Sequence, residues 1–108
     1  MTRKEKGRDA FHDEVMARLA GVDGLRSRAM FGGWGLYAGA AFFGIVYRGR
    51  LYLRTTPATR TGYASRGCGP FRPNAEQTLW DYYEVPAEVW EDEAALVEWA
   101  REAVRGRR

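Results

Sequence analysis

The chain has 108 residues and is 45% hydrophobic and 14% aromatic, which is too apolar for a disordered segment and enough to form one packed core. Its single cysteine excludes an intrachain disulfide, and no apolar run approaches the roughly 20 residues that cross a bilayer. The first residues lack the apolar stretch of a signal peptide, so we expect a cytoplasmic protein.

The net charge of +3 conceals an uneven distribution along the chain. Residues 24–75 hold eight arginines and no acid, whereas residues 76–108 hold nine acids against four arginines. Such a basic segment can bind an anionic partner, or it can be neutralised by the acidic segment that follows it.

The first predicted element is a helix over about residues 8–20. Apolar residues recur there at helical spacing from Phe11 to Val22, and Gly21 favours the end of the helix. The polar residues before it predict a flexible tail over 1–7.

Three segments rich in aromatic and aliphatic residues follow and predict strands: 28–37, which Gly32-Gly33 interrupts, then 41–47 and 50–55. Their connections, Ala38-Gly39 and Arg48-Gly49, leave room only for hairpin turns in which glycine takes a positive φ. We therefore expect antiparallel neighbours, and a parallel βαβ arrangement is excluded.

The remaining elements complete the predicted fold. A short helix begins at Pro57, a loop follows Phe71, a strand over 79–85 stops at Pro86, and a helix with one apolar face spans about 92–105. These elements predict one α+β domain over residues 8–105, followed by a tail over 106–108. Its centre is an antiparallel sheet of about five strands flanked by helices, in the order α-β-β-β-α-β-β-α.

The glycine cluster Gly32-Gly33-Trp34-Gly35 formally starts a dinucleotide-binding pattern. That pattern holds a pyrophosphate where a strand turns into a helix, whereas here another strand follows. We therefore predict a bulge or a sharp bend within the sheet.

Catalytic groups are scarce in the sequence. His12 is the single imidazole, and it lies at the margin of the apolar face of the first helix, where packing explains it. With Cys68 it supplies too few ligands for a metal, and no spacing supports the two as a nucleophile and its base. We expect no enzyme activity, no metal and no cofactor.

The basic segment contains a strand on which Arg50, Tyr52 and Arg54 share one face. With Arg48 they form a predicted interaction surface, because arginine beside aromatic rings can bind phosphate and stack on bases. The alternative, which the modest net charge favours, is that these arginines pair with the acids of residues 76–102. A further hypothesis is a small-ligand pocket lined by Trp34, Tyr37, Tyr52 and Trp80.

Over nearly the whole chain, the sequence resembles the N-terminal domain of the TfoX/Sxy family of bacterial competence regulators. The residues that carry the resemblance are Met30-Phe31-Gly32-Gly33-Trp34-Gly35-Leu36-Tyr37, Leu51-Tyr52-Leu53-Arg54, Tyr63, Pro70-Phe71, Tyr82-Tyr83-Glu84-Val85-Pro86, Leu96 and Trp99-Ala100. The resemblance implies a fold like that of secretion chaperones and a role in the transcriptional regulation of competence genes. It supplies no established catalytic residues.

We therefore expect a non-enzymatic regulatory module that acts through protein contacts. Its expected partner is a transcription factor, and a homodimer is a further expected form. Direct binding of nucleic acid through the central arginines is the second hypothesis, and it predicts a steep loss of affinity with salt.

Overall fold

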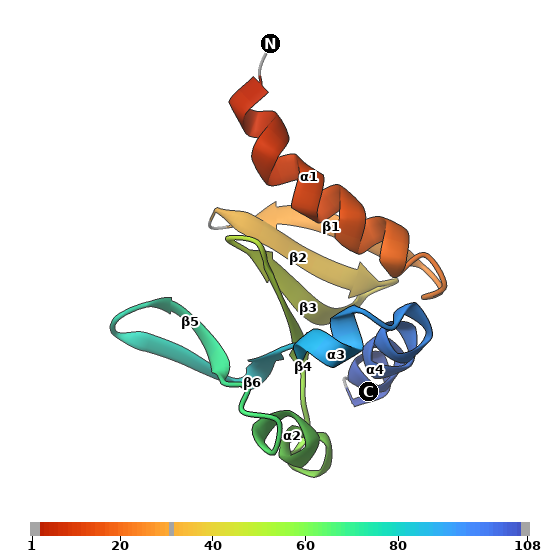
Figure 1. Cartoon of the computed structure of the whole chain (residues 1–108), viewed down its shortest axis with the longest axis vertical. Coiled ribbons are helices and arrows are strands. Elements are labelled where there is room, and N and C mark those ends of the chain that lie inside the picture. The colour runs from red at the N-terminus through yellow and green to blue at the C-terminus, as the bar shows by residue number, and fades with distance from the viewer. Residues whose placement is uncertain (1–2, 31, 107–108) are drawn as a thin grey trace.

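The structure is a computed structural model that describes residues 3–30 and 32–106, with side chains from residue 10 onward (Figure 1). In chain order its elements are α1 (Arg3–Arg18), β1 (Leu25–Met30), β2 (Gly33–Ala38), β3 (Ala41–Tyr47), β4 (Arg50–Arg54), α2 (Pro57–Ala64), β5 (Pro70–Asn74), β6 (Gln77–Glu84), α3 (Ala87–Trp90) and α4 (Glu93–Gly106). None of the described helices is long and apolar enough to cross a membrane.

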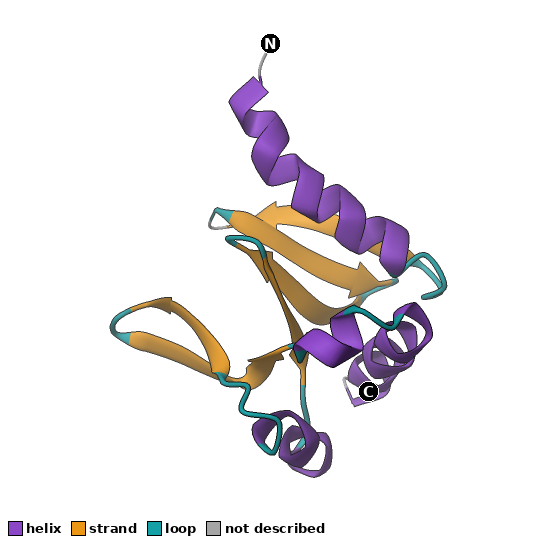
Figure 2. Ribbon diagram, in the orientation of Figure 1, coloured by secondary structure: helices purple, strands orange, loops and turns teal. Residues whose placement is uncertain are grey.

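The strands form one antiparallel sheet in the order β1-β2-β3-β4-β6-β5, which confirms the predicted α+β class (Figure 2). Strands β1 to β4 are joined by tight turns, so each pairs with its neighbour in sequence. At the β3–β4 turn, Arg48 and Gly49 both have positive φ, 50° and 76°. This is the combination of a two-residue type I′ hairpin turn.

The sheet has six strands where about five were predicted. The segment 28–37 divides into β1 and β2 at a turn in which Gly32 has φ +84°. The residues after Phe71, predicted as a loop, form β5, which ends the sheet and therefore tolerates two prolines, Pro70 and Pro73. Helix α1 begins at Arg3, ahead of the expected start near residue 8.

The glycine cluster lies in the sheet and not at a phosphate loop, but Gly32 is part of the β1–β2 turn, and the register shift of β2 against β3 comes after the cluster, between Leu36 and Tyr37. A Cβ atom at Gly33 would collide with the carbonyl oxygen of Val46 on β3. At Gly35 it would lie 2.6 Å from Cε of Met30 and 3.1 Å from a ring carbon of Phe42. Gly33 therefore needs glycine because β2 approaches the backbone of β3 too closely for a side chain, whereas a side chain at Gly35 would have to displace those of Met30 and Phe42.

Helices cover one face of the sheet, and the main core lies between these helices and the sheet (Figure 1). Helix α4 packs against β3 and β4, while α1 contributes further apolar residues. The fully buried residues of this core with the largest side chains are Phe43, Leu19, Leu36, Leu53, Leu96 and Val15. Their burial joins the helices to the sheet through the hydrophobic effect.

The opposite face of the sheet, here called the open face, carries a smaller core made by strand residues: Ile45, Tyr52, Phe71 and Tyr82. Phe71 is fully buried and lies with its ring centroid 4.8 Å from that of Tyr52 and 5.2 Å from that of Tyr47. It anchors the hairpin of β5 and the first half of β6, here called the arm, which projects from the rest of the fold in Figure 1.

Candidate functional site

The central arginines are the residues for which the sequence predicted contact with a partner, and half of them face carboxylates. Arg50 on β4 donates from Nη1 to both carboxylate oxygens of Glu84 on β6, at 3.1 and 2.9 Å. The carboxylate raises the pKa of the Arg50 guanidinium, chiefly through this hydrogen bond. Arg66 donates from Nε to Glu88 at 2.9 Å.

Asp81 on β6 lies within ion-pair distance of two arginines. One of its oxygens lies 3.1 Å from Nη2 of Arg60, and the other lies 3.9 Å from Nη1 of Arg54. Arg60 also donates from Nε to the hydroxyl of Thr55, at 2.9 Å. The buried Nε of Arg54 has no hydrogen-bond acceptor among the described residues.

These pairs support the alternative that the charge distribution favoured, in which the acidic segment neutralises part of the basic one. Arg50 and Arg54 of the predicted interaction surface are both paired with carboxylates of β6. Tyr52, between them, is 9% exposed and belongs to the smaller core, so its ring is not free for a partner. Arg48 is exposed at the β3–β4 turn.

Four other arginines have no carboxylate within ion-pair distance among the described side chains: Arg26, Arg28, Arg48 and Arg72. Three of them lie over aromatic rings, with Cζ 4.8 Å from the Tyr37 centroid for Arg26, 5.2 Å from Tyr47 for Arg48 and 5.9 Å from Trp80 for Arg72. The free positive charge therefore lies on β1, the β3–β4 turn and the arm.

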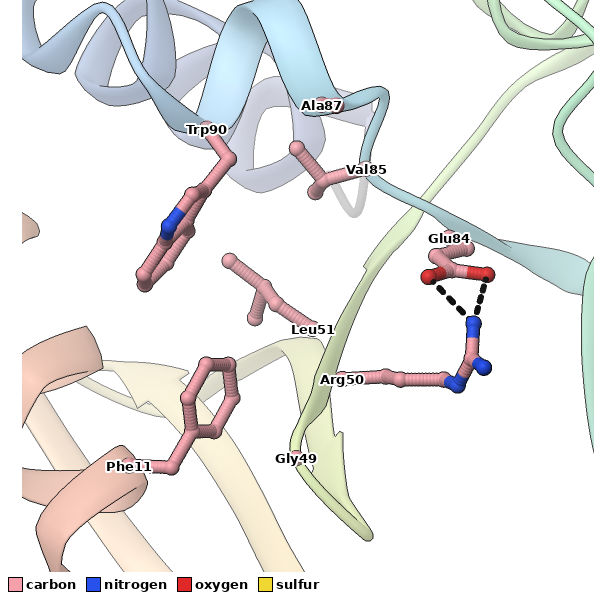
Figure 3. Close-up of a pocket in the computed structure, with 8 residues that line it drawn as sticks. All are labelled: Phe11, Gly49, Arg50, Leu51, Glu84, Val85, Ala87 and Trp90. Carbon is pink, nitrogen blue, oxygen red and sulfur yellow. Dashed lines mark hydrogen bonds and ion pairs between the residues drawn. The ribbon is translucent and has the colours of Figure 1, made fainter.

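A cavity of about 200 Å³ opens between α1, the start of β4 and α3 (Figure 3). Its apolar wall contains Phe11 and Trp90, whose ring centroids are 5.3 Å apart, together with Leu51 and Val85. Arg50 and Glu84 are also among the lining residues, but their ion-paired side chains point to the other side of β4 from Leu51 (Figure 3). The cavity is thus mainly apolar.

A second cavity, of about 430 Å³, shares Phe11 and Gly49 with the first. Trp34, Val46 and Arg48 are among the residues that line it. The two cavities therefore lie on neighbouring parts of the structure, beside Phe11 and the β3–β4 turn.

The pocket predicted from four aromatic residues is wrong. Trp34 lines the second cavity, but Tyr52 is buried in the smaller core and Trp80 lies exposed on the arm. The ring of Tyr37 lies tilted against that of Phe42, with centroids 5.2 Å apart. The sequence cannot show that these rings occupy different faces of the sheet, because the turns and bulges that set the faces depend on strand register.

His12 joins α1 to the sheet, which fits its predicted packing role. Its Nε2 lies 2.8 Å from the hydroxyl oxygen of Ser27 on β1, and its ring stacks on Trp34 with centroids 3.9 Å apart. Asp13, at 3.7 Å from Nδ1, is too distant for a hydrogen bond. Ser27 could not be predicted as the partner of His12, because nothing in the sequence shows which strand residue lies under the helix.

Cys68 lies after α2 and packs partly buried against the main core. Burial is the main reason that its thiol pKa is raised, with smaller effects of Glu84 and Glu88 in the same direction. A raised pKa disfavours the thiolate that a nucleophile needs.

A comparison with family models decides the relationship that the motifs suggested. The model described as TfoX N-terminal domain matches residues 17–106, nearly the whole chain. The chain belongs to the TfoX N-terminal domain family. No curated protein matches the chain.

In this TfoX N-terminal domain, most of the motif residues shape the fold. Gly32, Gly33 and Gly35 make the turn and the close strand contacts described above, with Met30 packed beside Gly35. Tyr37, Tyr82 and Tyr83 contact other aromatic rings at tilted angles, and Pro86 is the N-cap residue of α3, shortly after β6. Phe31 lies outside the described residues.

Proposed function

We propose that this TfoX N-terminal domain is a non-enzymatic regulatory module that acts on transcription through contact with a protein, the expected partner being a transcription factor. Family membership supports a regulatory role. The observation that carries protein contact is the exposed indole of Trp80 on the arm.

Trp80 is 59% exposed, and it is the large hydrophobic side chain that the described part of the chain leaves open to solvent. Arg72, on the neighbouring strand of the arm, lies over its ring. Tryptophan and arginine are the residues most enriched among those that dominate binding at protein interfaces. An exposed pair of this kind on a projecting hairpin suits docking into a pocket of a partner.

A complementation experiment tests this proposal. The gene is deleted, transcripts are measured, and the deletion is complemented with wild type, Trp80→Ala or the matched control Glu76→Ala, which alters the tip of the same arm. We expect the deletion to change a set of transcripts and Trp80→Ala to fail to restore them, while Glu76→Ala restores them. A photo-crosslinker placed at residue 80 should capture a transcription factor, or a second copy of the chain if the homodimer is the active form. Unchanged transcription on deletion, or full rescue by Trp80→Ala, contradicts the proposal.

Binding of nucleic acid is the second candidate function, and the free arginines favour it. The residues that carry it are Arg26, Arg28 and Arg48, because Arg50 and Arg54 already face carboxylates. A mobility-shift titration with single-stranded DNA at low salt should show a complex that Arg28→Gln weakens and that added salt dissociates. The absence of a complex at low salt would remove this candidate.

A further inference from the structure

We propose that the outer edge of β1 binds an acidic, extended segment of a partner protein, which adds to the sheet as a further strand. This edge lies at the opposite end of the sheet from β5, so the proposal goes beyond the contact proposed for the arm. Three observations carry it: a regular edge strand, backbone groups that point away from the sheet, and arginines without a carboxylate partner.

The two edges of the sheet differ. Strand β5 contains Pro70 and Pro73, and its register against β6 shifts twice. Prolines and bulges of this kind keep the edge of a sheet from pairing with another chain. Strand β1 has no proline, and it pairs with β2 in one unbroken register from Leu25 to Met30. No strand of the described chain pairs with its outer side, which leaves this edge open for pairing.

Alternate backbone groups of β1 point outward. The N–H of Gly39 donates to the carbonyl of Gly24 at 3.0 Å, and this pair continues the register of β1 against β2 by one position. Positions in an antiparallel pair alternate between hydrogen-bonded and non-hydrogen-bonded, so Arg28 bonds to β2 while the backbone groups of Ser27 and Ala29 point away from it. Outside the ladders of the sheet, the described backbone offers these two residues no partner. An added strand would satisfy them.

The side chains of β1 place positive charge beside this edge. Ser27 contacts His12 on the side that the helices cover, so its neighbours Arg26 and Arg28 lie on the open face. Neither arginine has a carboxylate within ion-pair distance among the described side chains. An added strand therefore meets uncompensated guanidinium groups on one of its two faces.

Arg28 has the main part in this contact. Arg26 donates from Nε to the carbonyl of Gly39 at 3.1 Å and lies over the ring of Tyr37, so its charge leans toward β2. Arg28 is exposed and keeps its donors for a partner. Guanidinium groups match carboxylates in geometry as well as in charge, which favours aspartate or glutamate at every second position of the added strand.

The same charges argue against other occupants. If two copies of the chain paired their β1 strands about Ser27, Arg28 of each copy would lie directly across from Arg26 of the other. Like charges placed in this way destabilise a strand pair, whereas opposite charges stabilise it. A nucleic acid can bind arginines, but it lacks the alternating N–H and C=O groups that pair with the edge of a sheet. An acidic strand satisfies both the backbone and the side chains.

The test uses end-blocked peptides of about eight residues, in which glutamate, glutamine or lysine alternates with threonine. NMR titrations of the purified chain measure affinity and amide exchange. We expect the glutamate peptide to bind at least about threefold more tightly than the glutamine peptide, and the lysine peptide to bind most weakly. The glutamate peptide should slow the exchange of the amides of Ser27 and Ala29, while those of Arg26 and Arg28, already bonded to β2, change little. Attraction between charges alone does not produce this alternation.

Three variants separate the contributions of backbone and charge. Ala29→Pro removes an outward N–H, and an edge strand tolerates proline at such a position. It should abolish binding of the glutamate peptide, whereas the matched control Ala29→Ser, which keeps the amide, should bind like wild type. Arg28→Glu should weaken the glutamate peptide and strengthen the lysine peptide, each several-fold. Trp80→Ala should change none of these affinities, so a failure of this proposal is distinguishable from a failure of the contact proposed for the arm.

Thermal unfolding shows whether each variant is folded. If Ala29→Pro does not fold, the amide exchange of wild type and the reversed preference of Arg28→Glu still decide the outcome. Several results would overturn the proposal. They are no binding of the glutamate peptide at millimolar concentration, equal affinity for the glutamate and glutamine peptides, and unchanged exchange at Ser27 and Ala29. If single-stranded DNA binds and the glutamate peptide does not, these arginines serve a nucleic acid and the proposal fails. Protection of Ser27 and Ala29 that rises with protein concentration in the absence of peptide would identify a second copy as the occupant and also contradict it.

Discussion

One nitrogen of Arg50 holds both carboxylate oxygens of Glu84, at 3.1 and 2.9 Å, and so joins β4 to β6 at the edge of the first cavity. Further along the same pair of strands, Asp81 faces Arg54 and Arg60. The side chains of Arg54 and Arg60 are 25% and 29% exposed, whereas that of Arg50 is 59% exposed. The carboxylates differ in the opposite sense, since Asp81 is 53% exposed and Glu84 is 35% exposed, so the difference between the two sites lies in the burial of the arginines.

Replacing these two carboxylates should have unequal effects. Asp81→Asn leaves two half-buried guanidinium groups without a charged partner and should lower the free energy of unfolding by about 1 to 2 kcal/mol. Glu84→Gln breaks an exposed pair and should change stability much less, because water already screens it. Urea unfolding of both variants measures the difference. Equal losses would mean that the burial of the arginines does not determine how much each ion pair stabilises the fold.

The turn residue Arg48 is a site where a substitution should stabilise the fold. Arg48→Asn puts a residue that tolerates positive φ at the first turn position and should raise the free energy of unfolding by about 1 kcal/mol. Arg48→Lys is the matched control, since it keeps the strain and should leave stability unchanged. Chemical unfolding of wild type and the two variants measures this. A loss of stability in Arg48→Asn would show that the backbone of Arg48 is not strained.

Stability should fall at alkaline pH because of buried tyrosine. Burial, followed by the charge of Glu102, raises the pKa of Tyr63 well above its usual value near 10. The folded state thus holds this proton more tightly than the unfolded state does. Its stabilisation is complete below about pH 10 and is lost as the pH rises further, at up to about 1.4 kcal/mol per pH unit.

The variant Tyr63→Phe tests this linkage. Unfolding free energies measured from pH 8 to 11 should fall less steeply for the variant than for wild type. Some fall remains in both, since burial also raises the pKa of Tyr52. Identical slopes would show that Tyr63 does not carry the effect.

The two cores should respond differently to truncation. Phe71→Ala removes the anchor of the arm, so amides of β5 and the first half of β6 should exchange faster while those of β2 and β3 stay protected. Leu96→Ala removes apolar contacts between α4 and the sheet in the main core. It should lower the free energy of unfolding of the whole domain by about 2 to 5 kcal/mol. Hydrogen exchange read by NMR separates the cases. Uniform loss of protection in Phe71→Ala would show that the arm is not a local unit.

Local patterns in the sequence were sufficient for most of the fold. Helix α2 begins at Pro57 as predicted, because proline at the first turn and the capping pair of Thr56 and Thr59 act locally. The hairpins followed from glycine positions in the same way. The predicted order included a second strand after the short helix, but the bounds of β5 were missed, because its Pro70 and Pro73 resemble a loop and are tolerated only where a strand ends a sheet.

The candidate sites were less predictable, since each depends on contacts between distant segments. Charge counts along the chain predicted that arginines would meet carboxylates, but the partners were set by the register of β4 against β6. The cavities beside Phe11 arise from three elements that the sequence does not place relative to one another. His12 could be assigned to packing, but Ser27 became visible as its partner only with the structure.

The late position of α4 in the chain also has a consequence for biosynthesis. Strands β1 to β4 pair with sequence neighbours, so the meander can form early, as local contacts do. Its apolar side, with Phe43 and Leu53, then faces the solvent until α4 emerges from the ribosome. During that interval the nascent chain is prone to aggregation and to capture by chaperones, and ribosome-stalled chains that end before residue 93 should associate with a chaperone that binds unfolded chains.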